Sequence, residues 1–456
     1  MLKRRILAGV VAASAAQLVP IVVQLLLVPV LIGHWGVAKY GLWLLLFTIP
    51  SYLAISDAGV GKAALSDLMV RIAKGDIAGT QRTFHSVIAT VAGLVLVIAG
   101  VLLIGLFLVP DSALPSAGVT AAEVRLAVLL VTAYGAAALA HALLACGFQP
   151  AGHFATQAWS WAAASLFEGV AALSAAISGV DIVGLALTYL LCRSISFAGS
   201  AWIMQRLAPW ATLTLAGANI ADVRRLLAPA TANLAVPLGN AVILQGTALA
   251  LGLGAGPAAV PAFSVARTLA RLSTQATWTV GRAVTPEFAL AQAQGNSALG
   301  ARLFGLIVVW GLVVGIPYSA AFFLLGDKVI GWWTHGTVVP GGLMLALMAV
   351  SILGSNLWNP VGDLLVVTNR QKVLSLSLLI LSALGVATSY LLSPLIGSAA
   401  GALGLALVDA GMAMTLGLFV LHSIFTPRQL GGAIESLWRE SQAMPRRLAQ
   451  FGRRAP

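Results

Sequence analysis

Apolar runs long enough to cross a bilayer recur along the whole chain, and this pattern constrains the fold more than any other feature. A membrane-spanning helix needs about 20 mostly apolar residues. Because lipid offers no hydrogen-bond partner to the backbone, such runs must be helical. The pattern predicts an all-α, polytopic membrane protein with twelve transmembrane helices. Their expected ranges are 6–32, 40–60, 85–109, 122–147, 157–179, 182–205, 226–251, 258–282, 302–326, 343–367, 373–395 and 399–423.

Composition separates a membrane protein from one that binds nucleic acid. Of the 456 residues, 59% are hydrophobic and 9% are charged, and the formal net charge is +12. The basic residues are scattered through short loops and a C-terminal tail, so no basic folded domain is available to hold a duplex. We therefore exclude nucleic acid as a partner and interpret the charge as a topological signal.

The distribution of lysine and arginine predicts the orientation of the chain. If the N-terminus is cytoplasmic, the outside segments carry only Lys39, Arg125 and Lys328. This asymmetry predicts that both termini are cytoplasmic. A basic start followed by an apolar run also imitates a signal peptide, but the run continues to Ile32 and is long enough to span, so we expect it to be retained.

A faint repeat divides the chain into two halves. Pro20 and Pro237 are separated by the same number of residues as Gly152 and Asn369. An even number of helices in each half predicts parallel repeats with a substrate site between them, near the midplane. The expected domains are an N-terminal six-helix lobe (1–206), a C-terminal six-helix lobe (207–425) and a basic cytoplasmic tail (426–456) that lies on the anionic inner leaflet.

Two arginines lie deep in the eighth predicted span, where lipid would demand aliphatic residues. Arg267 and Arg271 share one helical face with Thr274, and Gln275 lies beside them. One arginine at the bilayer centre costs about 2.5 to 3.5 kcal/mol on the insertion scale, so this face should look into a water-filled cavity. We expect these four residues to bind an anionic substrate. The alternative is that the arginines pair with acids on neighbouring helices or reach an interface.

Polar residues also interrupt the first and seventh predicted spans. Gln24 lies in the first of these and Asn240 in the seventh. Polar groups inside membrane segments commonly face the bundle interior or a water-filled cavity, so both residues are further substrate-binding candidates.

Three other charged residues lie near the middle of predicted spans. Glu168 and Arg193 are equidistant from the turn at 179–181, so an antiparallel hairpin places them at one depth. We expect a buried ion pair with a structural role, the alternative being contact with substrate. Asp409 is the candidate to neutralise Arg267 or Arg271.

Motifs for catalysis and for metal binding are missing. The run Gly59-Val60-Gly61-Lys62 departs from a phosphate-binding loop, because Ser56 and Ala63 occupy positions that require Gly and Ser or Thr. The two cysteines are far apart in sequence and the six histidines have no ligand spacing. We predict no catalytic residue, metal site or cofactor, and a protein that is not an enzyme.

Four stretches carry a resemblance to a known family. They are Gly36-Val37-Ala38-Lys39-Tyr40-Gly41-Leu42-Trp43, Ser56-Asp57-Ala58-Gly59-Val60-Gly61, Pro261-Ala262-Phe263-Ser264-Val265-Ala266-Arg267 and Val329-Ile330-Gly331-Trp332-Trp333. The chain resembles the polysaccharide exporters, the O-antigen and teichoic-type flippases. Ala58 stands where that family usually has Leu, and the two arginines match no fixed family motif. The resemblance implies the fold of the multidrug, oligosaccharidyl-lipid and polysaccharide exporter superfamily, with two six-helix lobes in a V-shaped bundle.

The resemblance also implies a function, against which two alternatives are weighed. It implies a flippase that moves undecaprenyl-diphosphate-linked oligosaccharide across the bacterial plasma membrane for surface polysaccharide synthesis. Its partners would be that lipid-linked oligosaccharide, membrane lipids, a polymerase and glycosyltransferases. A cation-coupled multidrug antiporter of the same fold would be expected to have an acid in the first helix that binds the coupling proton or cation. The first predicted span contains no acid. A membrane-embedded glycan polymerase or ligase would be expected to show a large outside loop with catalytic polar groups.

Overall fold

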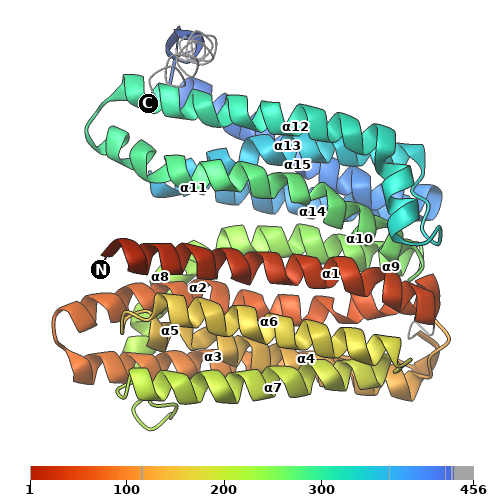
Figure 1. Cartoon of the computed structure of the whole chain (residues 1–456), viewed down its shortest axis with the longest axis horizontal. Coiled ribbons are helices and arrows are strands. Elements are labelled where there is room, and N and C mark those ends of the chain that lie inside the picture. Colours follow the sequence, from red (N-terminus) through yellow and green to blue (C-terminus); the bar gives the residue numbers. More distant parts are fainter. Residues whose placement is uncertain (1, 114–116, 369, 427, 433–434, 436–456) are drawn as a thin grey trace, which may run out of the picture. The chain divides into compact units, whose positions relative to one another are not determined.

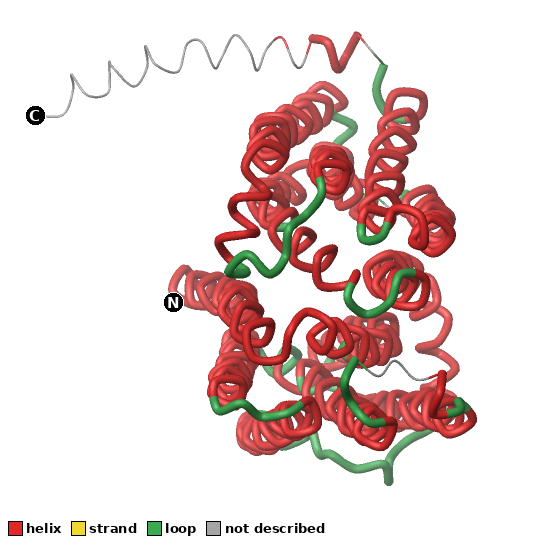
Figure 2. The backbone as a smooth tube through the Cα atoms, turned by 90° about the vertical axis from the view of Figure 1, so that its right-hand side faces the viewer, coloured by secondary structure: helices red, strands yellow, loops and turns green. Residues whose placement is uncertain are grey.

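The computed structural model describes residues 2–113, 117–368, 370–426, 428–432 and 435. In this part of the chain all regular structure is helical (Figures 1 and 2). The elements are α1 (Leu2–Leu46), α2 (Thr48–Ala73), α3 (Ile77–Leu108), η1 (Asp111–Ala113), α4 (Ala121–Leu143), α5 (Ala145–Phe148), α6 (Phe154–Ile177), α7 (Ile182–Leu207), α8 (Ile220–Ala241), η2 (Val242–Gly246), α9 (Thr247–Gly254), α10 (Ala259–Ala270), α11 (Leu272–Ala293), α12 (Ser297–Trp333), α13 (Gly342–Val367), α14 (Gln371–Ile396) and α15 (Ala399–Ser423).

Each predicted span coincides with one or more of these helices to within about two residues at its ends, and the all-α, polytopic membrane fold is confirmed. Among the described residues, ten helices are long and apolar enough to cross a membrane by length and composition. The first of these candidates, Ala15–Leu53, extends into α2. No candidate in the described part of the chain covers the α10–α11 pair, which carries Arg267 and Arg271. Large exposed apolar side chains on α3, such as Leu96 and Leu108, are what a lipid-facing helix requires.

Several helices continue or break where the sequence pattern did not indicate it. The loop expected between the first two spans is helical, because α1 runs on to Leu46 through a kink at Gly36. Gly36 has φ 75° and ψ 167°, a backbone conformation that glycine adopts without a steric penalty. The seventh span is divided by the π-helix η2, and the eighth breaks between α10 and α11.

The chain forms two compact units, each with its own packing. The first comprises Met1–Pro261 and Trp332–Val338, and the second comprises Ala262–Gly331 and Val339–Pro456. In the first unit α1 packs on α6, α4 packs on α7, and α2 packs on α3, α4 and α8. The segment from α8 to α9 therefore lies with the first unit, whereas the boundary at residue 206, which follows the sequence repeat, stays a prediction.

Helices of the second unit approach closely because small residues line their contacts. Here α13 packs on α11 and α15, and α14 packs on α15. A Cβ atom built on Gly354 of α13 would lie 2.7 Å from the carbonyl oxygen of Asp409 on α15. Small residues allow such backbone approach, which maximises van der Waals contact between membrane helices.

Candidate functional site

The two predicted substrate-binding arginines flank the break between α10 and α11. Arg271 is the residue at the break, and its amide donates to the carbonyl of Arg267 over 3.0 Å. The Arg271 side chain is exposed, whereas that of Arg267 is partly buried, with its guanidinium 5.2 Å from the centre of the Phe263 ring. The break therefore gives Arg271 access to solvent or ligand.

The other two residues predicted on this face differ in exposure. Thr274 is buried and its hydroxyl donates to the carbonyl oxygen of Arg271 over 2.7 Å, so the hydroxyl caps the broken turn. Gln275 is partly exposed. In this conformation Thr274 supports the backbone at Arg271, while Gln275 remains accessible.

Gln24 and Asn240 belong to the first unit, whereas the four residues above belong to the second. Gln24 is exposed on α1 and Asn240 is partly exposed on α8. Their participation in one site with Arg267 and Arg271 stays a prediction.

An asparagine that the sequence analysis missed joins α11 to α13. The Asn356 amide donates to the Ser273 hydroxyl over 2.9 Å, and its carbonyl oxygen accepts from the Thr277 hydroxyl over 3.0 Å. Asn356 is fully buried, and buried amides in membrane helices bond across helices because lipid cannot satisfy them. Two asparagines in a mostly apolar run, Asn356 and Asn359, were the available signal, but the sequence does not say which helix either one faces.

Asp409 of α15 is held by two neutral donors on α13. The Ser351 hydroxyl donates to one carboxylate oxygen over 2.5 Å, and the Trp358 indole donates to the other over 2.8 Å. The Asp409 carboxylate also attracts Arg271, although no ion pair within 4.0 Å joins the two in the described part of the chain. Its predicted role as a counter-charge therefore depends on a longer-range interaction.

A double-mutant cycle on thermal stability measures that interaction. We expect Asp409→Asn to destabilise the wild type more than it destabilises an Arg271→Gln variant, by about 0.5 kcal/mol or more. The physical reason is that a low-dielectric interior preserves attraction beyond contact distance. The matched control repeats the cycle with Lys328→Gln, an exposed cation of the same unit, and should give additive effects. Additivity for Arg271 as well would show that the two charges do not interact.

A buried charge cluster lies in the first unit. Glu168 of α6 and Arg193 of α7 form a double contact, Nε to Oε1 at 2.5 Å and Nη2 to Oε2 at 2.5 Å. Each charged side chain is only 5% exposed. The two residues that the hairpin argument placed at one depth are therefore in direct contact, in the bidentate geometry that suits guanidinium and carboxylate.

Aromatic and imidazole groups complete the surroundings of Arg193. Its guanidinium carbon lies 4.9 Å from the Trp161 ring centre and 5.8 Å from that of Tyr134. His141 places Nδ1 3.5 Å from an Arg193 terminal nitrogen. These neighbours come from α4 and α6, and no spacing in the sequence links them to Arg193. The cluster stabilises the packing of three helices and leaves Arg193 little freedom to contact a substrate.

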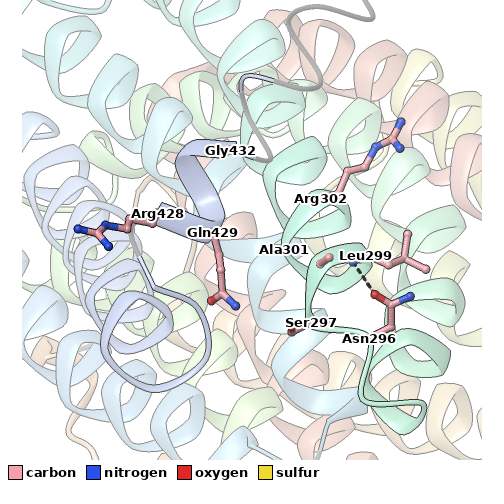
Figure 3. A pocket seen from close by; sticks show the side chains of 9 residues that line it. Asn296, Ser297, Leu299, Ala301, Arg302, Arg428, Gln429 and Gly432 are labelled. Carbon is pink, nitrogen blue, oxygen red and sulfur yellow. Dashed lines mark hydrogen bonds between the residues drawn. The ribbon is translucent and has the colours of Figure 1, made fainter.

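A pocket of about 560 Å³ lies in the second unit, between the start of α12 and the segment after α15 (Figure 3). Its lining residues are Asn296, Ser297, Ala298, Leu299, Ala301, Arg302, Arg428, Gln429 and Gly432. In Figure 3 the Arg302 and Arg428 side chains point in opposite directions. The pocket includes none of the predicted site residues, and most of the predicted tail (426–456) lies outside the described residues.

Comparison with protein-family models gave no match, and no curated protein matched. Solved structures do share the architecture. A multidrug-resistance MATE-family transporter of the MOP superfamily, inward-facing, aligns with TM-score 0.66 and 15% identity over 90% of this chain and 98% of its own. The lipid II flippase MurJ, in an inward closed conformation, aligns with TM-score 0.68 and 11% identity over 93% of this chain and 90% of its own.

A third similar structure is a MOP-superfamily transporter from Pyrococcus furiosus. It aligns with TM-score 0.62 and 13% identity over 92% of this chain and 96% of its own. Identities this low establish the fold and not the substrate, and the neighbours include both a lipid flippase and multidrug transporters. The two compact helical units, the membrane-spanning helices and these alignments together show that the chain has the fold of the MOP-superfamily transporters.

Proposed function

We propose that this protein is a flippase for lipid-linked oligosaccharide, with undecaprenyl diphosphate as the carrier. The observation that carries the proposal is the exposed Arg271 side chain, about one turn from Arg267, at a helix break within the eighth predicted span. A guanidinium in contact with hydrocarbon would be strongly unfavourable, so exposure at this position supports a water-filled surface. A pair of cations on such a surface favours an anionic ligand, and a diphosphate is one.

The surroundings of the nearby acid strengthen this proposal. Asp409 gives its two carboxylate oxygens to Ser351 and Trp358 and does not enclose the Arg271 guanidinium. Among the described residues, no acid in contact with Arg271 neutralises its positive charge, so this charge can attract an anion from the exposed side. In the proposed mechanism Arg267 and Arg271 hold the diphosphate, Gln275 contacts the sugars, and the polyprenyl chain stays in lipid.

The proposal includes a location and partners. The protein would lie in the bacterial inner membrane with both termini cytoplasmic, as the excess of basic residues on one side favours. A polymerase and glycosyltransferases would act on the same oligosaccharide before and after its transfer.

Complementation of surface glycan in a flippase-deficient strain tests the proposal. We expect Arg267→Gln and Arg271→Gln each to lower glycan display about tenfold or more, since a charge-assisted hydrogen bond contributes roughly 1.5 to 3 kcal/mol and about 1.4 kcal/mol is tenfold. Arg271→Lys should lower glycan display less than Arg271→Gln does if a point charge is enough to bind the diphosphate. It should lower display nearly as much if binding needs two parallel hydrogen bonds from a guanidinium. Lys328→Gln, an exposed cation of the same unit, is the matched control.

Protein abundance in the membrane must be measured alongside glycan display. Full display by the double glutamine variant at normal abundance would contradict the proposal. Loss of the protein itself would instead assign the arginines a structural role.

A cation-coupled multidrug antiporter remains the second candidate, because one observation favours it. Asp409 is a carboxylate buried at 6% exposure in a membrane helix, the kind of group that can exchange a proton or cation. This candidate predicts that Asp409→Asn abolishes efflux of cationic drugs while glycan display is unaffected. The flippase predicts the reverse dependence on Arg267 and Arg271.

A further inference from the structure

The start of α8 is tied to α2 and α3 by an ionic cluster. One Arg225 terminal nitrogen lies 3.1 Å from Asp67 of α2 and 3.0 Å from Asp222 on its own helix. The second Asp222 oxygen lies 3.3 Å from Arg82 of α3. These four residues, Asp67, Arg82, Asp222 and Arg225, are called the α8 cluster below. Three helices therefore meet through alternating charges.

Neutral contacts fix the chain just before this cluster. The connector between α7 and α8 docks on α3 through Thr212, whose hydroxyl lies 2.9 Å from His85 and 3.2 Å from the Gln81 amide. The backbone N–H of Asn219 donates to the Ser86 hydroxyl over 2.9 Å. The connector is thus anchored independently of charge, and the α8 cluster acts on the helix that follows it.

The exposed fractions of the side chains in the α8 cluster indicate that its ion pairs can break and form again. Arg225 and Arg82 are 42% and 54% exposed, whereas Asp222 is 11% exposed. Ion pairs that water reaches contribute little and are screened by salt, so they can form and break reversibly. This distinguishes the cluster from the buried Glu168–Arg193 pair.

Opening the cluster would not leave Asp67 of α2 without a partner. Asp67 also accepts a 2.8 Å hydrogen bond from Arg71 of its own helix, and Arg71 in turn bonds Asp76 over 2.8 Å. Hydrogen bonds from the Gly79 amide and from Arg71 lower the pKa of the Asp76 carboxyl, so it stays ionised at neutral pH. When Arg225 leaves, Asp67 keeps Arg71, Asp222 keeps Arg225, and Arg82 is already largely in water.

The helix beyond the cluster contains a place to bend. After α8 the chain passes through the π-helix η2 (Val242–Gly246) before α9, and Pro237 lies just ahead of it. A π-helix disrupts the regular hydrogen-bond ladder, and such segments and prolines are the usual positions of helix bending. The second unit begins at Ala262, soon after α9, so the segment from α8 to α9 leads into one of the covalent connections between the units.

We propose that the α8 cluster is a reversible ionic latch, which holds the start of α8 on α2 and α3 and releases it so that α8 can swing about η2. The latch depends on charge and geometry alone and not on which substrate the protein carries.

Hydrogen–deuterium exchange of the full chain in lipid nanodiscs, without substrate, tests the latch. In peptides covering residues 219–230 we expect Arg225→Gln to exchange roughly three- to tenfold faster than wild type, because release exposes the first turns of α8. Asp67→Asn should act similarly, and the double variant should be no faster than the faster single variant. Arg224→Gln, an exposed neighbour outside the cluster, is the matched control and should match wild type.

The dependence of exchange on ionic strength is a second, independent test of the latch. Raising salt from about 0.01 to 1 M shortens the Debye length from roughly 30 to 3 Å, so it should speed exchange in the wild type but not in Arg225→Gln. Wild-type exchange in the Arg225→Gln variant would overturn the proposal. So would faster exchange that extends equally to α4, because it would mean general destabilisation. No substrate is used, so failure here leaves the proposed transport function untouched.

Discussion

Replacing Glu168 by Gln should lower the free energy of unfolding by about 3 to 5 kcal/mol, because it leaves Arg193 charged, buried and without its counter-ion. Both side chains are only 5% exposed, so water cannot replace the lost partner. Arg193→Gln should have an effect of similar size. The double glutamine variant should recover part of the loss, since it buries no unpaired charge.

The measurement is thermal unfolding in detergent, with the folded fraction quantified by size-exclusion chromatography. The matched control is Asp111→Asn in the same unit, because this acid is 69% exposed and its oxygen lies 2.7 Å from an Arg125 terminal nitrogen. Loss of such an exposed pair should cost no more than about 1 kcal/mol. Unchanged stability in both Glu168→Gln and Arg193→Gln would contradict the structural role.

Gly404→Ala should destabilise the second unit by about 3 kcal/mol, which is at the upper end of the usual destabilisation caused by adding atoms to a well-packed core. A Cβ at Gly404 would overlap the Ser389 hydroxyl oxygen and the Gly385 carbonyl oxygen of α14. The carbonyl is backbone and cannot rotate aside, so α14 and α15 would have to separate and lose dispersion contacts along their interface.

Gly417 provides the control on the same helix. A Cβ at Gly417 meets nothing within 4 Å, so Gly417→Ala should be neutral or should stabilise by up to about 1 kcal/mol through helix propensity. Equal melting temperatures for the two alanine variants would show that the α14–α15 contact is looser than the structure indicates.

The sequence by itself determined the fold class and the positions of the membrane helices. Runs of about 20 apolar residues have one stable solution in a bilayer, so length and hydrophobicity were enough. The Glu168–Arg193 contact was also predictable, because a short turn between two antiparallel helices converts equal sequence distances into equal depth. The location of Arg267 and Arg271 on adjacent turns followed from helical periodicity in the same way.

Only the tertiary structure decided which helices meet and where they break. It placed α8 against α2 and α3, gave Asp409 the Ser351 and Trp358 donors, surrounded Arg193 with aromatic rings, and broke the eighth span at Arg271. Periodicity reports which face of a helix is polar but carries no information about the identity of the helix opposite. Contacts between residues far apart in sequence depend on how side chains of two helices fit together and on how closely the two backbones approach. Both are set only when the helices pack.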